Sequence, residues 1–125
     1  MSKKSKRSKA TSITEKVRMN VLMRDRTRCI FCEMGYHNDE CVGEAAKDIK
    51  DIMHYIPRSA GGLGIERNLA VGCRYHHSMY DNGNEGRHYE MKELFRHYLQ
   101  SRYTDWNENE LVYNKWSFFG GNKWK

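Results

Sequence analysis

Apolar residues recur along this chain at two spacings, one typical of helices and one typical of short strands. Helical spacing predicts a helix from about residue 15 to 26, capped by Ser12 or Thr14, and a longer helix over residues 89–103. The apolar residues on one side of the longer helix are Met91, Leu94, Phe95, Tyr98 and Leu99. Residues 76–81 predict the start of a third helix, and a stretch rich in Asn and Gly at residues 82–86 interrupts it.

Two other segments predict short strands. Residues 49–56 are rich in Ile and end at Pro57, and residues 69–73 are largely apolar. Between them lies the glycine loop, Ser59-Ala-Gly-Gly-Leu-Gly64, which can bring backbone close to another group. Residues 33–47 show little periodicity and predict a loop. This mixture of helices and short strands predicts a small α+β fold.

The two ends of the chain differ from its middle. Residues 1–12 are polar, basic and low in complexity, which predicts disorder. Residues 13–103 hold the periodic segments and predict one domain. Residues 104–125 form an extension rich in aromatic side chains. We expect it to pack against the long helix or a second subunit rather than to stack on bases.

Positive charge is concentrated at the N-terminus. The net charge is +6, and the five basic residues of the first nine account for most of it, leaving +1 (6 − 5) for the rest of the chain. These five residues are Lys3, Lys4, Lys6, Arg7 and Lys9. Such a tail either binds phosphate groups, with an affinity that falls as salt rises, or only solubilises the chain.

The composition favours a domain that is held together by a metal. Of the 125 residues, 30% are charged and 38% hydrophobic, so the core is thin, and small cores commonly depend on disulfides or a structural metal. The basic segment after Met1 lacks the apolar stretch of a signal peptide, and no segment approaches a transmembrane length. We therefore expect a cytoplasmic protein with no membrane partner, in which paired cysteines bind metal more often than they form disulfides.

Four cysteine and histidine residues have the spacing of a closed zinc site. Cys29 and Cys32 form a CxxC turn, and Cys73 and His76 repeat its spacing about forty residues later. A Cys3His set is a recognised structural composition for Zn²⁺, and it leaves no open position. The alternative is a redox CxxC beside an unrelated buried Cys73, but no βαβ pattern surrounds the pair. Cys41 could replace His76, although its spacing from Cys32 is irregular.

Residues outside this cluster predict a second centre. His54 ends the first predicted strand, and its imidazole can take a proton from water near neutral pH. His77 and Asp81 lie four residues apart on one helix face, where an imidazole and a carboxylate can bind a divalent cation. Asn68, at the far end of the glycine loop, can hold that loop or orient His54. Each of these residues taken singly has a structural explanation. Their order and spacing together favour one shared functional site.

In that order and spacing the residues resemble a known family. His54-Tyr-Ile-Pro-Arg-Ser-x-Gly-Gly, Asn68-Leu and Cys73-x-x-His76-His77 resemble the HNH endonucleases in their zinc-stapled form, over roughly residues 17–85. The resemblance implies a ββα-metal core, in which two strands, a loop and a helix surround one catalytic cation.

The resemblance also implies a role for each residue. His54 would be the general base, Asn68 would shape the loop, and His77 would bind the catalytic cation, which would be Mg²⁺, Mn²⁺ or Ni²⁺. The cation would contact the scissile phosphate of DNA and stabilise the leaving 3′-oxygen, so that the products carry 5′-phosphate and 3′-hydroxyl ends. Arg58 and the basic tail would contact the nucleic acid. By analogy, such a hydrolase would work in a bacterial host cell beside phage packaging proteins, and double-strand cutting would favour a homodimer.

One position departs from the family pattern. Many members carry Asp or His just before the general base as a ligand of the cation, whereas this chain has Met53, a poor ligand for hard cations. Asp81 can compensate, and Asp51 is a poorer substitute, because along a strand it should point away from the face of His54. Two alternatives therefore stay open. One is a zinc-stabilised module that binds nucleic acid with weak or no catalysis, and the other is a protein-interaction knuckle that salt and DNA affect little.

Overall fold

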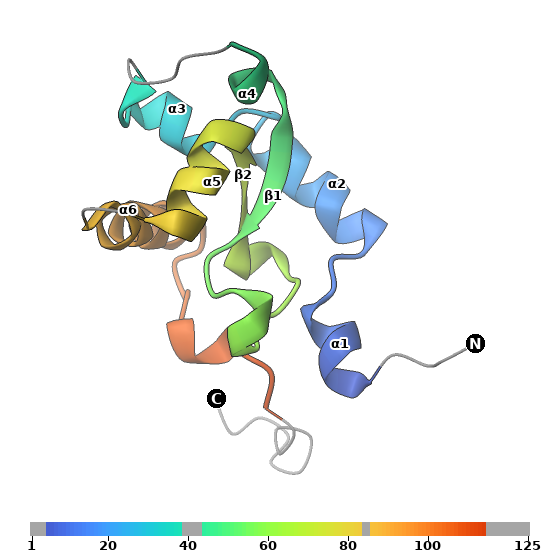
Figure 1. Cartoon of the computed structure of the whole chain (residues 1–125). Coiled ribbons are helices and arrows are strands. Elements are labelled where there is room, and N and C mark those ends of the chain that lie inside the picture. The colour runs from blue at the N-terminus through green and yellow to red at the C-terminus, as the bar shows by residue number, and fades with distance from the viewer. Residues whose placement is uncertain (1–4, 39–43, 84–85, 115–125) are drawn as a thin grey trace.

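The computed structural model describes residues 5–38, 44–83 and 86–114, which form the small α+β fold that the sequence predicts (Figure 1). Short 3-10 turns at Arg58–Ala60, Glu66–Asn68 and Glu108–Glu110 lie in the connections. The helices and strands follow one another as α1 (Lys6–Thr11), α2 (Glu15–Arg24), α3 (Ile30–Met34), α4 (Glu44–Asp48), β1 (Lys50–His54), β2 (Leu69–Cys73), α5 (Arg74–Asn82) and α6 (Arg87–Arg102).

The two strands form an antiparallel pair that runs from Lys50 opposite Cys73 to His54 opposite Leu69. The glycine loop and its flanking turns connect them, and α5 begins immediately after β2. Strand, loop, strand and helix are therefore consecutive in the chain. The start of α5 lies beside the start of β1, where the N–H of Arg74 donates to the carbonyl of Ile49 at 2.8 Å. Farther along α5, the hydroxyl of Tyr80 donates to the carbonyl of Tyr55 at 2.7 Å, just past the end of β1.

Helices cover both faces of this small sheet (Figure 1). α2 covers one face, where Val21 packs with Leu69 and Val71. The other face is covered by α3, α5 and α6. There β1 contributes Met53, and Tyr55, the residue that follows the strand, is also buried. Of the predicted apolar side of the long helix, the fully buried residues are Met91, Phe95 and Leu99. Within the described ranges, no helix has the length and the apolar run that crossing a membrane requires.

A buried carboxylate connects three of these elements. Asp25, which follows α2, accepts hydrogen bonds from the guanidinium of Arg24 at 2.7 and 3.0 Å and from the backbone N–H of Val71 at 2.9 Å. The hydroxyl of Tyr98 on α6 donates to it as well. A buried charge requires such partners, and here they join α2 to β2 and α6.

The N-terminal segment differs from the expectation of disorder, because residues 6–11 form α1. An isolated helix of six residues would be unstable in water, so contacts with the glycine loop must hold it. The carbonyl of Ala10 accepts from the N–H of Gly64 at 3.0 Å, and the Arg7 guanidinium donates to the carbonyl of Ser59 at 3.0 Å. The expected loop at residues 33–47 likewise contains helical turns at α3 and α4. Lys3, Lys4 and Cys41 lie outside the described residues.

The described part of the C-terminal extension packs on the glycine loop rather than only on the long helix. Gly62 forms a β-bridge with Val112, and the indole N–H of Trp106 donates to the carbonyl of Arg67 at 2.7 Å. A side chain at Gly62 would not fit, because its Cβ would lie 1.6 Å from the carbonyl oxygen of Ile56. The loop is thus fixed on one side by α1 and on the other by the extension.

Candidate metal centre and catalytic site

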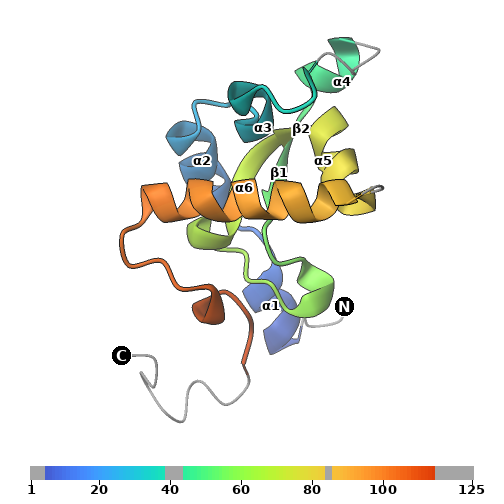
Figure 2. The ribbon, with the colours of Figure 1, turned by 90° about the vertical axis from the view of Figure 1, so that its left-hand side faces the viewer.

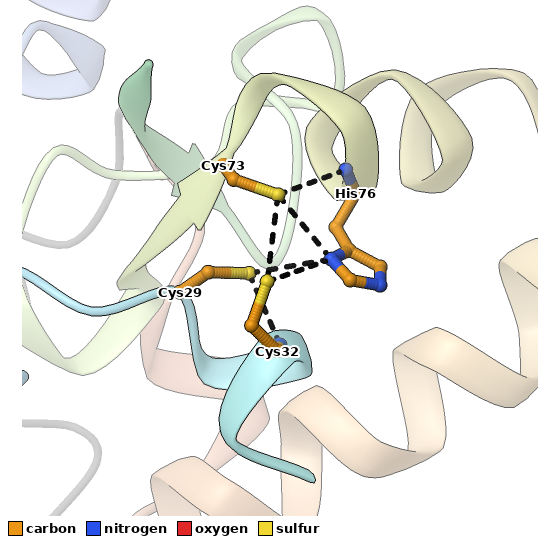
Figure 3. Close-up of side chains that lie close together, drawn as sticks. All are labelled: Cys29, Cys32, Cys73 and His76. Carbon is orange, nitrogen blue, oxygen red and sulfur yellow. Dashed lines mark hydrogen bonds between the residues drawn. The ribbon is translucent and has the colours of Figure 1, made fainter. Parts of the chain in front are cut away.

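The side chains of Cys29, Cys32, Cys73 and His76 converge on one point (Figure 3). Their potential ligand atoms all lie within 4.8 Å of one another, which is close enough to hold a metal ion. Nδ1 of His76 lies 3.3 Å from the sulfur of Cys73 and 3.5 Å from those of Cys29 and Cys32. The predicted grouping of these four residues is confirmed.

The spacing of these atoms fits a tetrahedral cation. Zn–S bonds of about 2.3 Å place two sulfurs of a tetrahedron roughly 3.8 Å apart. The sulfurs of Cys32 and Cys73 are 3.7 Å apart. The cluster therefore needs little rearrangement to surround an ion of that size.

Local backbone structure aims the four side chains. Cys29 caps α3 and Cys73 caps α5, and each sulfur accepts a hydrogen bond of 3.4 Å from the N–H three residues later. The Nε2–H of His76 donates to the carbonyl of Tyr36, which leaves Nδ1 unprotonated toward the thiols. Each CxxC-type spacing is thus the first turn of a helix.

The thiols also influence one another's ionisation. A hydrogen bond from Cys29, helped by His76, lowers the pKa of Cys73 to about 3, whereas the hydrogen bond to Cys73 and burial raise the pKa of Cys29. The thiol groups are therefore close enough to share protons by hydrogen bonding. A cation would be expected to displace the remaining thiol protons.

A second group of polar side chains lies in an open groove along α5 and β1. Nε2 of His77 is 3.5 Å from a carboxylate oxygen of Asp81, and its Nδ1 is 2.9 Å from a carboxylate oxygen of Asp51. Arg74 donates two hydrogen bonds to Asp51, at 2.9 and 3.1 Å. The bonds from Arg74, and to a smaller extent the bond from His77, lower the pKa of Asp51. The groove is also lined by Ile52, Ser78 and Asn82.

Asp51 has a contact that the sequence analysis did not predict. Asp51 does point away from His54, but that direction brings it to His77, where its carboxylate accepts from Nδ1–H and orients the ring. Nε2 is then left as a ligand atom on the side of Asp81. The strand pattern contained this signal, since Asp51 and Met53 share one side of β1 and Met53 faces the helices that include α5.

His54 does not itself line this groove, but Ile52, two residues earlier on the same side of β1, does. Its Nε2 is 3.2 Å from the carbonyl of Thr11, which only accepts, so Nε2 carries the proton. No described residue hydrogen-bonds its Nδ1. Burial lowers the pKa of His54, and the charges of Arg58 and His77 lower it further. The imidazole is therefore neutral, with Nδ1 as its basic atom, at neutral pH.

Asn68 is fully buried and holds both ends of the glycine loop. Its amide donates to the carbonyls of Ile56 and Leu63 at 3.0 and 2.9 Å, and its oxygen accepts from the N–H of Ile56 at 2.8 Å. Of the two roles that the sequence suggested for Asn68, the contacts correspond to holding the loop.

Two of the basic residues that we expected to contact nucleic acid hydrogen-bond the protein itself. Arg58 donates to the hydroxyls of Thr11 and Ser12 at 3.4 and 3.2 Å. Arg7 donates to the backbone of the glycine loop. These two side chains connect α1 to the glycine loop beside His54. Lys6 has an interaction partner as well.

Replacing Gly64 with Ala should raise the pKa of His54 toward its usual value of 6.5. The new Cβ would lie 2.1 Å from the carbonyl oxygen of Ser12, so the backbone beside Thr11 must shift and expose the imidazole. A lowered histidine pKa gives stability that is complete above pH 6.5 and is lost as the pH falls to the folded pKa, and in the variant this loss is smaller. NMR titration of the ring would measure the change. Gly86→Ala is the control, because its Cβ meets nothing within 4 Å and its φ of 79° strains the backbone at the start of α6 instead. An equal His54 pKa in both variants would contradict the prediction.

Comparisons of the chain with protein-family models, with curated proteins and with solved structures found no match. The function is therefore argued from the geometry and chemistry of the site.

Proposed function

We propose that this protein is a metal-dependent DNA endonuclease of the HNH type. One observation carries the proposal: neighbouring histidines face two different places. His76 belongs to the closed Cys3His cluster. His77 presents a ring nitrogen to an open groove, beside the carboxylate of Asp81. A protein that used metal only to stabilise its fold would not need the second centre.

The order of elements supports the same conclusion. β1, the glycine loop, β2 and α5 follow one another as the ββα-metal core requires. His54, Asn68 and His77 stand at the end of β1, at the end of the loop and on α5. We propose that this unit is a ββα-metal fold and that the cluster holds structural Zn²⁺.

The groove residues suit a hard divalent cation. The ligand atoms of His77 and Asp81 are 3.5 Å apart, and Asp51 fixes the ring from the opposite nitrogen, as a carboxylate does in many metal sites. Mg²⁺, Mn²⁺ or Ni²⁺ bound there would supply Lewis acidity and neutralise charge on the scissile phosphate.

His54 supplies the base in this proposal. The Thr11 carbonyl holds the proton on Nε2, so Nδ1 can accept a proton from the attacking water. Its lowered pKa keeps the ring in the basic form at neutral pH. Hydrolysis then leaves a 5′-phosphate and a 3′-hydroxyl.

Met53 favours a second candidate, a zinc-stabilised module that binds nucleic acid without cutting it. Met53 is fully buried, and its sulfur packs where a Cβ at Gly72 would lie, 2.3 Å away. It therefore cannot take the place of the missing ligand. α1 also covers one nitrogen of His54.

Supercoiled plasmid with Mg²⁺, Mn²⁺ or Ni²⁺ would test the proposal. Wild-type protein should nick the plasmid only with a cation, and His77→Ala should lose this activity while keeping its zinc. His97→Ala is the matched control, because His97 is an exposed histidine on α6 outside the groove. Salt-sensitive DNA binding without cutting under any cation would establish the module instead, and neither binding nor cutting would favour the protein-interaction knuckle.

A further inference from the structure

Arginines gather at a second place, a pocket between the turn after α2 and the end of α6. Its volume is about 390 Å³. In Figure 2, α6 runs across the view from α5 toward α2. Tyr98 and Arg102, near the last turn of α6, line this pocket. The arginines that line it are Arg24, Arg26, Arg28 and Arg102.

The carboxylates of this pocket do not neutralise it. Asp25 is committed to Arg24 and to the interior hydrogen bonds described above, and Glu33 lies 3.6 Å from Arg28 in an exposed pair. The Arg102 guanidinium lies 5.3 Å from the centre of the Tyr98 ring, and no described carboxylate pairs with it or with Arg26. With Arg24 paired to Asp25 in the interior, three arginines and one glutamate remain and leave an excess of positive charge in the pocket.

The backbone of this turn is unusual in the same place. Arg26 and Thr27 have φ values of 57° and 55°, in the left-handed region that favours glycine. The N–H of Thr27 donates to the carbonyl of Leu22 at 2.8 Å, which is the closure that usually places glycine after a helix. Arginine therefore occupies a strained position that glycine would relieve, and such strain clusters at functional sites.

We propose that this arginine pocket binds backbone phosphates of the nucleic acid outside the step that is cut. The inference rests on the proposed function and adds a second contact surface to it. Guanidinium groups suit phosphate oxygens because they donate paired hydrogen bonds and stay charged. Contacts of this kind position a protein on the duplex without reading its sequence.

Arg26→Gly tests the proposal without threatening the fold, because glycine relieves the positive φ while it removes the guanidinium. We expect an equal or higher melting temperature, several-fold weaker binding to a duplex oligonucleotide without added catalytic cation, and a log K against log salt slope that is smaller by ~0.9. Arg26→Gly combined with Arg102→Gln should lower the slope by about twice as much. Hydrolysis of a small phosphodiester substrate, which reaches only the groove, should not change.

The control is Arg18→Gln, which removes the same charge from an exposed position on α2 outside the pocket. Equal DNA affinity and salt slope in Arg26→Gly and wild type would overturn the pocket while leaving the nuclease intact. An equal loss in Arg18→Gln would also overturn it, since the effect would then be one of net charge. Wild-type protein that neither binds nor cuts DNA would instead refute the proposed function. Competition by inorganic phosphate alone at low concentration would point to a small phosphorylated ligand and overturn the backbone contact.

Discussion

Cys73→Ser should unfold the domain at ordinary temperatures and abolish its zinc content. The sulfur of Cys73 contacts Cys32 and His76 directly, and Cys73 caps the start of α5. Binding of structural zinc contributes apparent free energies of about 10–16 kcal/mol at pH 7 in small domains. Small domains as a whole are stable by only about 5–15 kcal/mol. Losing the metal therefore removes most or all of the net stability.

Circular dichroism melting and metal analysis would check this result. A strong chelator added to the wild-type protein should produce the same unfolded spectrum, and added Zn²⁺ should restore the fold. Cys41→Ser is the control thiol, because we do not assign Cys41 to the cluster, and it should keep one zinc and the wild-type melting temperature. A Cys73→Ser protein that melts like wild type would show that the cluster is not a structural metal site.

His54→Ala should slow DNA cleavage about 10²–10⁴-fold, which is the usual contribution of one positioned proton acceptor. Zinc content should stay at the wild-type level, since His54 has no contact with the Cys3His cluster. The loss should appear in the rate at saturating DNA rather than in DNA affinity, because the base acts on water. Initial rates of plasmid nicking would measure the effect.

His88→Ala is the matched control for this variant. His88 also hydrogen-bonds a backbone carbonyl, that of Tyr80 at 2.7 Å, but it lies at the start of α6 outside the groove. It should therefore share any general loss of stability and keep the cleavage rate. Equal nicking by His54→Ala and wild type would remove His54 from the chemistry and favour a different base.

Local spacing explains which features could be predicted from the sequence. The buried side of α6, the two strands and the grouping of Cys29, Cys32, Cys73 and His76 all follow from periodicity or from the reach of one helical turn. The structure confirms these features. The roles of His54 and His77 stay predictions, because they depend on reactivity rather than on local spacing.

Features that depend on contacts between distant segments could not be predicted in this way. α1 looked disordered because its stability comes from Gly64 and Ser59, about fifty residues away. Asp25 gave no signal, because its partners on β2 and α6 are far along the chain. The contact of Asp51 with His77 follows from the alternation along β1, because Asp51 shares the side of Met53, which faces α5.

His76 and His77 are adjacent in the first turn of α5, so the proposed zinc and the groove depend on the same turn. Without the ion, that turn would lose its connection to α3 through His76, and the position of the His77 ring would depend on Asp51, the only residue outside α5 among the polar contacts described for it. On the proposed function, a newly synthesised chain would be harmless to the DNA around it. It would become a nuclease only after it has acquired zinc, so the supply of that metal would set when cutting begins.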